Sequence, residues 1–162
     1  MKSPLHFGVR EFVSTHAKTF AFALSLALAA GTAAAQGDAM SCSGGQRLSA
    51  TELRQGTTLA IFWASWSPKS RDVFERINAA AAKWGGRARV VAINYQEDPQ
   101  EARRFLGGRA LSTPVCFDVD GSFSNGYDVA TLPEFVLLKD GAVAVRGRLD
   151  DEADGKIGGA IR

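Results

Sequence analysis

The stretch from Phe62 to Arg71, FWASWSPKSR, contains the residues whose types and spacing first point to chemistry. Ser67 and Ser70 follow Trp66 and are separated by two residues. A C-x-x-C motif places two thiols at this spacing, at the start of a helix, where a thiolate is stabilised for disulfide exchange. Serine hydroxyls neither form disulfides nor ionise usefully at such a position. The sequence therefore keeps the frame of a dithiol site without its sulfur atoms.

The first 35 residues predict a secretory signal peptide. Three basic residues precede or flank the start of an apolar run over 20–30, and Ala33 and Ala35 occupy the two small positions of a cleavage site. We predict cleavage after Ala35, and hence a periplasmic or secreted protein. The apolar run is shorter than the roughly 20 residues that a membrane-spanning helix needs. An uncleaved N-terminal membrane anchor is the alternative.

The charge of the predicted mature chain is close to balanced. The sequence has 19 basic and 17 acidic residues, and the signal peptide removes three of the former and one of the latter. No strongly basic surface is therefore expected, and we predict neither nucleic acid nor, after signal cleavage, membrane as a partner.

The mature chain is also predicted to lack histidine, because His6 and His16 both lie in the signal peptide. This excludes a Ser-His or Cys-His nucleophilic pair and a zinc site that uses histidine. We predict no metal and no cofactor.

Cys42 and Cys116 are the two cysteines of the chain. Export favours a disulfide between them, which would tie the leader to the rest of the fold. Two unpaired thiols, with Cys116 as a small buried hydrophobic residue, and a redox-active pair are the alternatives. The immediate neighbours of both cysteines in the sequence include no cation or helix N-terminus that would stabilise a thiolate.

The pattern of apolar residues predicts one α/β domain over residues 47–162, preceded by a flexible leader at 36–46. Continuous apolar runs at 57–65 and 88–96 predict buried strands. Ser67 is expected to cap a helix that begins at Pro68. The remaining predicted elements are a short helix or turn at 48–56, a helix from Pro99, a strand at 113–121, a connector at 124–133, a hairpin at 134–149 around Asp140-Gly141, and a C-terminal helix. This order indicates a central mixed sheet flanked by helices.

The order of elements, with the strings FWASWSPKSR, PVCFDVDG and YDVATLPEF, resembles the thioredoxin fold. It is most similar to the exported TlpA/ResA-type thiol-disulfide oxidoreductases, over about residues 47–162. The resemblance implies that Ser67 stands at the position of the attacking cysteine and Ser70 at that of the resolving cysteine. It also implies a cis peptide bond between Leu132 and Pro133, lining a substrate groove.

The sequence departs from this family at three further positions. Ile61 replaces a polar residue that many relatives hold below the dithiol. Val73 takes the place of a glutamate that often follows the motif, and Glu134 replaces the usual small residue or threonine after the cis-proline. The resemblance thus implies a loss of proton-carrying groups together with the dithiol.

From these observations we predict a redox-inactive protein that binds an exported protein or an extended peptide. The predicted groove consists of Trp66, Ser67, Pro68, Leu132 and Pro133. The alternative is a thiol-disulfide oxidoreductase or peroxidase that acts through Cys116, with Cys42. A purely structural subunit of a larger exported complex is a third possibility.

Overall fold

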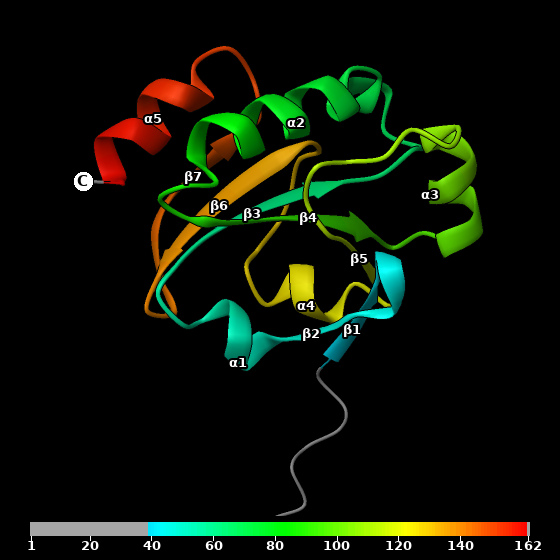
Figure 1. Cartoon of the computed structure of the whole chain (residues 1–162), viewed down its shortest axis with the longest axis horizontal. Coiled ribbons are helices and arrows are strands. Elements are labelled where there is room, and N and C mark those ends of the chain that lie inside the picture. The colour runs from blue at the N-terminus through cyan, green and yellow to red at the C-terminus, as the bar shows by residue number, and fades with distance from the viewer. Residues whose placement is uncertain (1–38, 162) are drawn as a thin grey trace, which may run out of the picture. The chain divides into compact units, whose positions relative to one another are not determined.

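The computed structural model describes residues 39–161 (Figure 1). The predicted signal peptide and its cleavage site lie outside the described residues. The strands are β1 (Ala39–Cys42), β2 (Arg47–Ser49), β3 (Thr57–Trp63), β4 (Arg89–Tyr95), β5 (Val115–Asp118), β6 (Glu134–Lys139) and β7 (Ala142–Arg148). The helices are α1 (Ala50–Leu53), α2 (Val73–Trp84), α3 (Pro99–Leu106), α4 (Ser122–Asn125) and α5 (Ala153–Ala160), with 3-10 turns η1 (Ser43–Gly45) and η2 (Pro68–Ser70). None of these helices is long and apolar enough to cross a bilayer.

Within residues 39–161 the strands form one seven-stranded mixed sheet in the order β2-β1-β5-β4-β3-β6-β7. The central strands β3, β4 and β5 are parallel, whereas β6 pairs antiparallel with β3 and forms a hairpin with β7. In this register Phe62 lies opposite Ile93, and Ile93 lies opposite Cys116. The predicted α/β architecture, a central mixed sheet flanked by helices, is confirmed.

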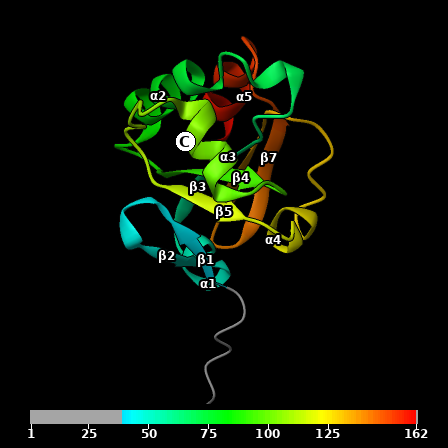
Figure 2. The same ribbon diagram turned by 90° about the vertical axis from the view of Figure 1, so that its right-hand side faces the viewer.

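Helices cover both faces of the sheet (Figures 1 and 2). The α2 and α5 helices lie over one face, and α1 and α4 lie over the other. Alternate residues of β3 point to the two sides: Ile61 packs in the cluster with α2 and α5, and Phe62 packs in the cluster that contains Cys42 and Cys116. Burial of β3 on both faces explains its uninterrupted apolar sequence.

Local signals place several element ends where the sequence predicts them. Asp98 accepts a hydrogen bond from the N–H of Gln100, with Pro99 as the first residue of α3, and Gly107 ends that helix with φ of 60°. The β6–β7 hairpin turns at Asp140 and Gly141, which both have positive φ. Ser49 and Glu52 form a reciprocal capping box at α1.

The segment after β3 differs from the prediction of a continuous helix from Pro68. Residues 68–70 form a 3-10 turn, and the α-helix begins only at Val73. Its buried face then recurs at helical spacing through Val73, Ile77, Ala80 and Trp84. The early turn holds Ser70 inside the protein, fully buried.

The prediction of a flexible leader at 36–46 is wrong over residues 39–46. Residues 39–42 form β1, which pairs antiparallel with β2 and with β5. Cys42 lies opposite Cys116 in the ladder, and the two form a disulfide with 3.9 Å between their Cα atoms. Backbone pairing with a distant strand and the disulfide order this segment, although its composition is small and polar. The folded domain therefore includes residues before position 47.

Candidate functional site

Ser67 and Leu132 bring together the two segments that the sequence predicts to form a groove. The β3 and β6 strands pair so that Phe62 lies opposite Glu134. The chain that leaves β3 and the chain that enters β6 therefore meet at the same edge of the sheet. There the hydroxyl of Ser67 donates a hydrogen bond to the carbonyl oxygen of Leu132 at 3.1 Å. The Leu132–Pro133 peptide bond is cis.

The side chains around this contact differ in exposure. Trp66 has 57% of its surface exposed, whereas the other two tryptophans, Trp63 and Trp84, are buried. Ser67 and Pro133 are buried, and Leu132 is half-buried. The ring of Trp66 lies 6.5 Å from that of Tyr95. The site therefore presents one large aromatic side chain to solvent above a buried, partly polar floor.

The prediction that the Ser67 side chain caps a helix is wrong, and the Ser70 hydroxyl is unpaired within residues 39–161. The side chain of Ser67 makes no capping hydrogen bond, because its hydroxyl donates to Leu132 instead. The hydroxyl oxygen of Ser70 is buried and has no hydrogen-bond partner in the described part of the chain. The N–H of Ser70 bonds to the carbonyl oxygen of Ser67 at 2.9 Å, which closes the 3-10 turn.

The surroundings of Ser67 do not activate a nucleophile. Its hydroxyl proton is directed at a backbone carbonyl, which cannot accept that proton as a general base. Residues 39–161 include no histidine. The arrangement orients a hydroxyl group and a peptide turn, but it lacks the base that a serine nucleophile requires.

A buried carboxylate, Glu97, fixes the backbone just before Trp66. It accepts hydrogen bonds from the N–H of Ser65 at 3.0 Å and from the side-chain amide of Asn94 at 2.7 Å. The Ser65 hydroxyl donates to its other oxygen. Sequence reasoning missed this residue, because Glu97 comes 32 positions after Ser65 and its local sequence reads only as the end of a strand.

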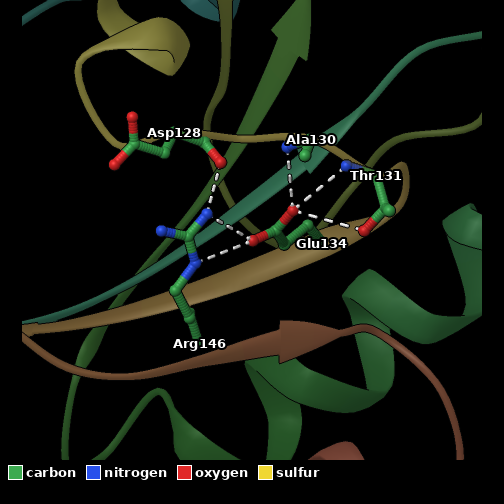
Figure 3. A network of polar contacts seen from close by, with 5 residues as sticks. All are labelled: Asp128, Ala130, Thr131, Glu134 and Arg146. Carbon is green, nitrogen blue, oxygen red and sulfur yellow. Dashed lines mark hydrogen bonds and ion pairs between the residues drawn. The ribbon is translucent and has the colours of Figure 1, made fainter.

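A second buried carboxylate, Glu134, fixes the segment around the cis peptide bond (Figure 3). Its oxygens accept hydrogen bonds from the N–H groups of Ala130 and Thr131 at 3.3 and 3.2 Å. Arg146 forms an ion pair with it at 3.1 Å and also donates to the carbonyl oxygen of Asp128. The unusual residue after Pro133 therefore binds together the loop that precedes the cis peptide bond and strand β7.

Comparison with known proteins decides the family. The redoxin family profile matches residues 17–157. The chain belongs to the redoxin family. No curated protein matches this redoxin. Among solved structures it is similar to a protein described as thiol:disulfide interchange protein DsbE from Chlorobium tepidum, at 24% identity and a TM-score of 0.66, over 76% of this chain and 92% of that one.

Two further solved structures agree with that likeness. StoA from Bacillus subtilis is 21% identical, with a TM-score of 0.57 over 67% of this redoxin and 84% of StoA. A secreted disulfide oxidoreductase of Mycobacterium tuberculosis, described as homologous to Escherichia coli DsbE, is 19% identical, with a TM-score of 0.58 over 67% and 81% of the two chains. These similarities establish a thioredoxin-like fold.

The two cysteines of this redoxin lie away from Ser67. The Cys42–Cys116 disulfide belongs to the apolar cluster on one face of the sheet, whereas α2, which follows Ser70, packs on the other face. Arg47 from β2 and Arg89 from β4 line the same cavity as the disulfide. The residues next to each cysteine in the sequence include neither cation, because it is strand pairing that brings β2 and β4 to this cavity.

Proposed function

We propose that this protein is an exported redoxin of the TlpA/ResA type in which Ser67 and Ser70 replace the dithiol, and that it binds extended polypeptides without exchanging disulfides at this site. The observation that supports this most is the hydrogen bond from Ser67 to the carbonyl oxygen of Leu132. A hydroxyl group at the dithiol position joins the two walls of the groove, and no sulfur is present there to form a mixed disulfide.

The absence of sulfur from the groove is not compensated by the remaining cysteines. Cys42 and Cys116 are bonded to each other and pack on the sheet face opposite to α2. A polypeptide held at Trp66 and Pro133 would therefore meet hydroxyl and carbonyl groups. Binding there is reversible, because serine and backbone groups form only non-covalent contacts with a peptide.

Two features support the binding of an extended segment. Trp66 is 57% exposed, and tryptophan is among the side chains that contribute most energy at protein interfaces. The N–H of Leu132 donates to no acceptor among the described residues. An extended segment alongside Leu132 would accept this hydrogen bond and pair with the backbone, as in β-strand addition.

The carboxylates on each side of the groove make it a pre-organised surface. Glu97 holds Ser65, one residue before Trp66, and Glu134 holds Thr131, one residue before Leu132. Both carboxylates are buried. A site whose walls are fixed before binding loses less conformational entropy when a partner binds.

The test is a titration of the isotope-labelled protein with reduced insulin B chain whose thiols have been blocked by alkylation. This probe is extended and cannot form a disulfide. We expect NMR shift changes at the backbone amides of Trp66, Ser67 and Leu132. Shift changes confined to the edge strands β2 or β7 would contradict the groove, and would favour the structural-subunit alternative.

A further inference from the structure

A cavity of about 430 Å³ lies beside the Cys42–Cys116 disulfide. Both cysteines line it, together with residues of β2, α1 and the start of β4 and with Gln46 and Pro114 from the adjoining loops. The lining residues that carry the argument are Cys42, Cys116, Arg47, Arg89 and Glu52. None of the residues proposed for the Trp66 groove is among those that line this cavity, so the two sites are separate.

The cavity carries a surplus of positive charge. Arg89 donates to the backbone carbonyl of Glu52 at 3.0 Å, and Arg47 donates to that of Ala39 at 3.2 Å. Both acceptors are neutral, so the charge that opposes the two guanidinium groups comes from the carboxylate of Glu52, which interacts electrostatically with Arg89. Glu52 is the one acidic residue among the lining residues. Hydrogen bonds from the N–H and hydroxyl of Ser49, with a smaller contribution from Arg89, lower the pKa of Glu52 and engage its carboxylate. Two cations against one carboxylate leave a net charge of +1.

We propose that the Cys42–Cys116 disulfide is an exchange site for a small thiol that carries a carboxylate group. The volume of this cavity falls within the range of about 300–1,000 Å³ that is typical of pockets for small molecules. Arg47 and Arg89 would bind its carboxylate, because guanidinium groups pair with carboxylates through two parallel hydrogen bonds. The disulfide in the wall is then within reach of the thiol of the same molecule.

The exchange takes place in two balanced steps. The thiolate of the small molecule attacks Sγ of Cys42, a new S–S bond forms, and the bond to Cys116 breaks, so that Cys116 leaves as a thiolate. A second small thiolate then attacks the outer sulfur of the mixed disulfide and releases Cys42 as a thiolate. The two protein sulfurs gain two electrons, and two small thiols become one small disulfide. Both protein thiolates take up protons from water.

Exposure favours Cys42 as the sulfur attacked first. Cys42 keeps 6% of its surface exposed, whereas Cys116 has none. Cys116 lies in β5, between β1 and β4, whereas Cys42 is the last residue of β1. The Cys116 thiolate that is released in the first step still lines the cavity. The two guanidinium groups of that cavity stabilise its negative charge.

The experiment measures reduction of the disulfide in the native, full-length redoxin by three thiols of similar size and different charge. These are 3-mercaptopropionate, 2-mercaptoethanol and cysteamine, with the rate followed by alkylation and mass and expressed per concentration of thiolate. At low salt we expect the negatively charged thiol to react about tenfold faster than the positively charged one, since charged clefts raise association rates by at least that factor. Added salt should reduce the difference.

Variants assign the preference to the cavity. Arg47→Gln with Arg89→Gln should reduce the ratio between the two charged thiols to about twofold or less, because steering depends on the charge of the cleft. Arg104→Gln is the matched control: this exposed residue of α3 pairs with Glu101, and its loss should leave the ratio unchanged. If the double variant does not fold, each single variant and the salt dependence of the wild type provide the same test.

Equal rates for the three thiols, or reduction only after denaturant is added, would overturn this proposal and leave the disulfide as a structural link. The outcome is independent of the groove. The thiol assay contains no peptide and the peptide titration contains no free thiol, so failure of the peptide-binding proposal and failure of the thiol-exchange proposal are distinguishable.

Discussion

The hydroxyl of Ser67 and the carbonyl oxygen of Leu132, 65 residues apart in sequence, are joined by a hydrogen bond of 3.1 Å. This bond links the turn after β3 to the cis peptide bond before β6. Ser70, three residues later and equally enclosed, has a hydroxyl without a partner in the described part of the chain. Of the two serines in this short motif, one has a hydrogen-bonded hydroxyl and the other has one that is unpaired among the described residues.

Replacement of each serine by alanine should affect the free energy of unfolding differently. Ser67→Ala removes a bond between two largely buried groups and should lower the free energy of unfolding by about 1 kcal/mol. Ser70→Ala removes an unpaired buried hydroxyl and should leave the stability unchanged or raise it slightly. Urea unfolding of the two variants measures both. A loss at Ser70 as large as that at Ser67 would show that the Ser70 hydroxyl has a partner in solution.

Cysteines placed at both positions should give the groove the chemistry that it lacks. We expect the Ser67→Cys/Ser70→Cys variant to reduce insulin disulfides, because a thiol at the start of this turn and helix gains the stabilisation that such positions give to thiolates. The wild type should show no insulin reduction at the same concentration. Ser67→Cys alone is the control, since one thiol can form a mixed disulfide but has no partner to resolve it. An inert, folded double variant would mean that the frame of a dithiol site is not retained.

Loss of Glu134 should destabilise the wall of the groove that contains the cis peptide bond. Glu134→Ala removes the acceptor for two backbone N–H groups and leaves Arg146 without its carboxylate. We expect a loss of about 2 kcal/mol, because two backbone N–H groups lose their acceptor and the partly exposed Arg146 loses its ion-pair partner. Arg148→Ala, which lies opposite Glu134 in the ladder but makes no ion pair with it, should change stability by less than about 0.5 kcal/mol. Thermal unfolding of the Glu134→Ala and Arg148→Ala variants measures both losses. Similar losses for the two variants would contradict a stabilising role for the Glu134 contacts.

Asp154 should make the attachment of α5 to α2 sensitive to acid. Its carboxylate accepts hydrogen bonds from Lys83 and from the indole N–H of Trp84, and these lower its pKa below the ordinary value. A carboxyl group with a lowered folded-state pKa stabilises the fold above its unfolded pKa, and this stabilisation is lost as the pH falls. The wild type should therefore lose more stability than Asp154→Asn between about pH 5 and pH 2. Asp151→Asn is the control, because the Asp151 side chain is fully exposed although it pairs with Arg76, and it should keep the wild-type profile. An unchanged profile for Asp154→Asn would refute this assignment.

The parts of the fold that depend on local sequence could be predicted. The apolar run of β3, the Asp98-Pro99 start of α3 and the Asp140-Gly141 turn each specify their structure through neighbouring residues. The ordered strand at 39–42 could not be predicted in this way. Its pairing with β5 and its disulfide depend on residues about 74 positions away, which composition does not reveal.

The candidate site could likewise be predicted only where it depends on local sequence. The sequence predicts which residues surround the groove, because the motif and the cis-proline resemble a known arrangement. It does not predict that Ser67 bonds to Leu132 rather than capping a helix, since a local cap and a distant carbonyl compete for one hydroxyl. Glu97, and the arginines beside the disulfide, were also missed, because only the packing of separate strands brings them to their partners.

The central claim is that polypeptides bind at Trp66 without covalent exchange. The most direct measurement is the affinity of thiol-blocked insulin B chain, labelled for fluorescence anisotropy, for the wild type, Trp66→Ala and Val119→Ala. Val119 is the matched control, because it is 56% exposed and lies in the turn after β5. We predict that Trp66→Ala weakens binding at least about tenfold, as loss of a central aromatic contact does, while Val119→Ala binds like the wild type. Equal affinity for all three folded proteins would contradict the account.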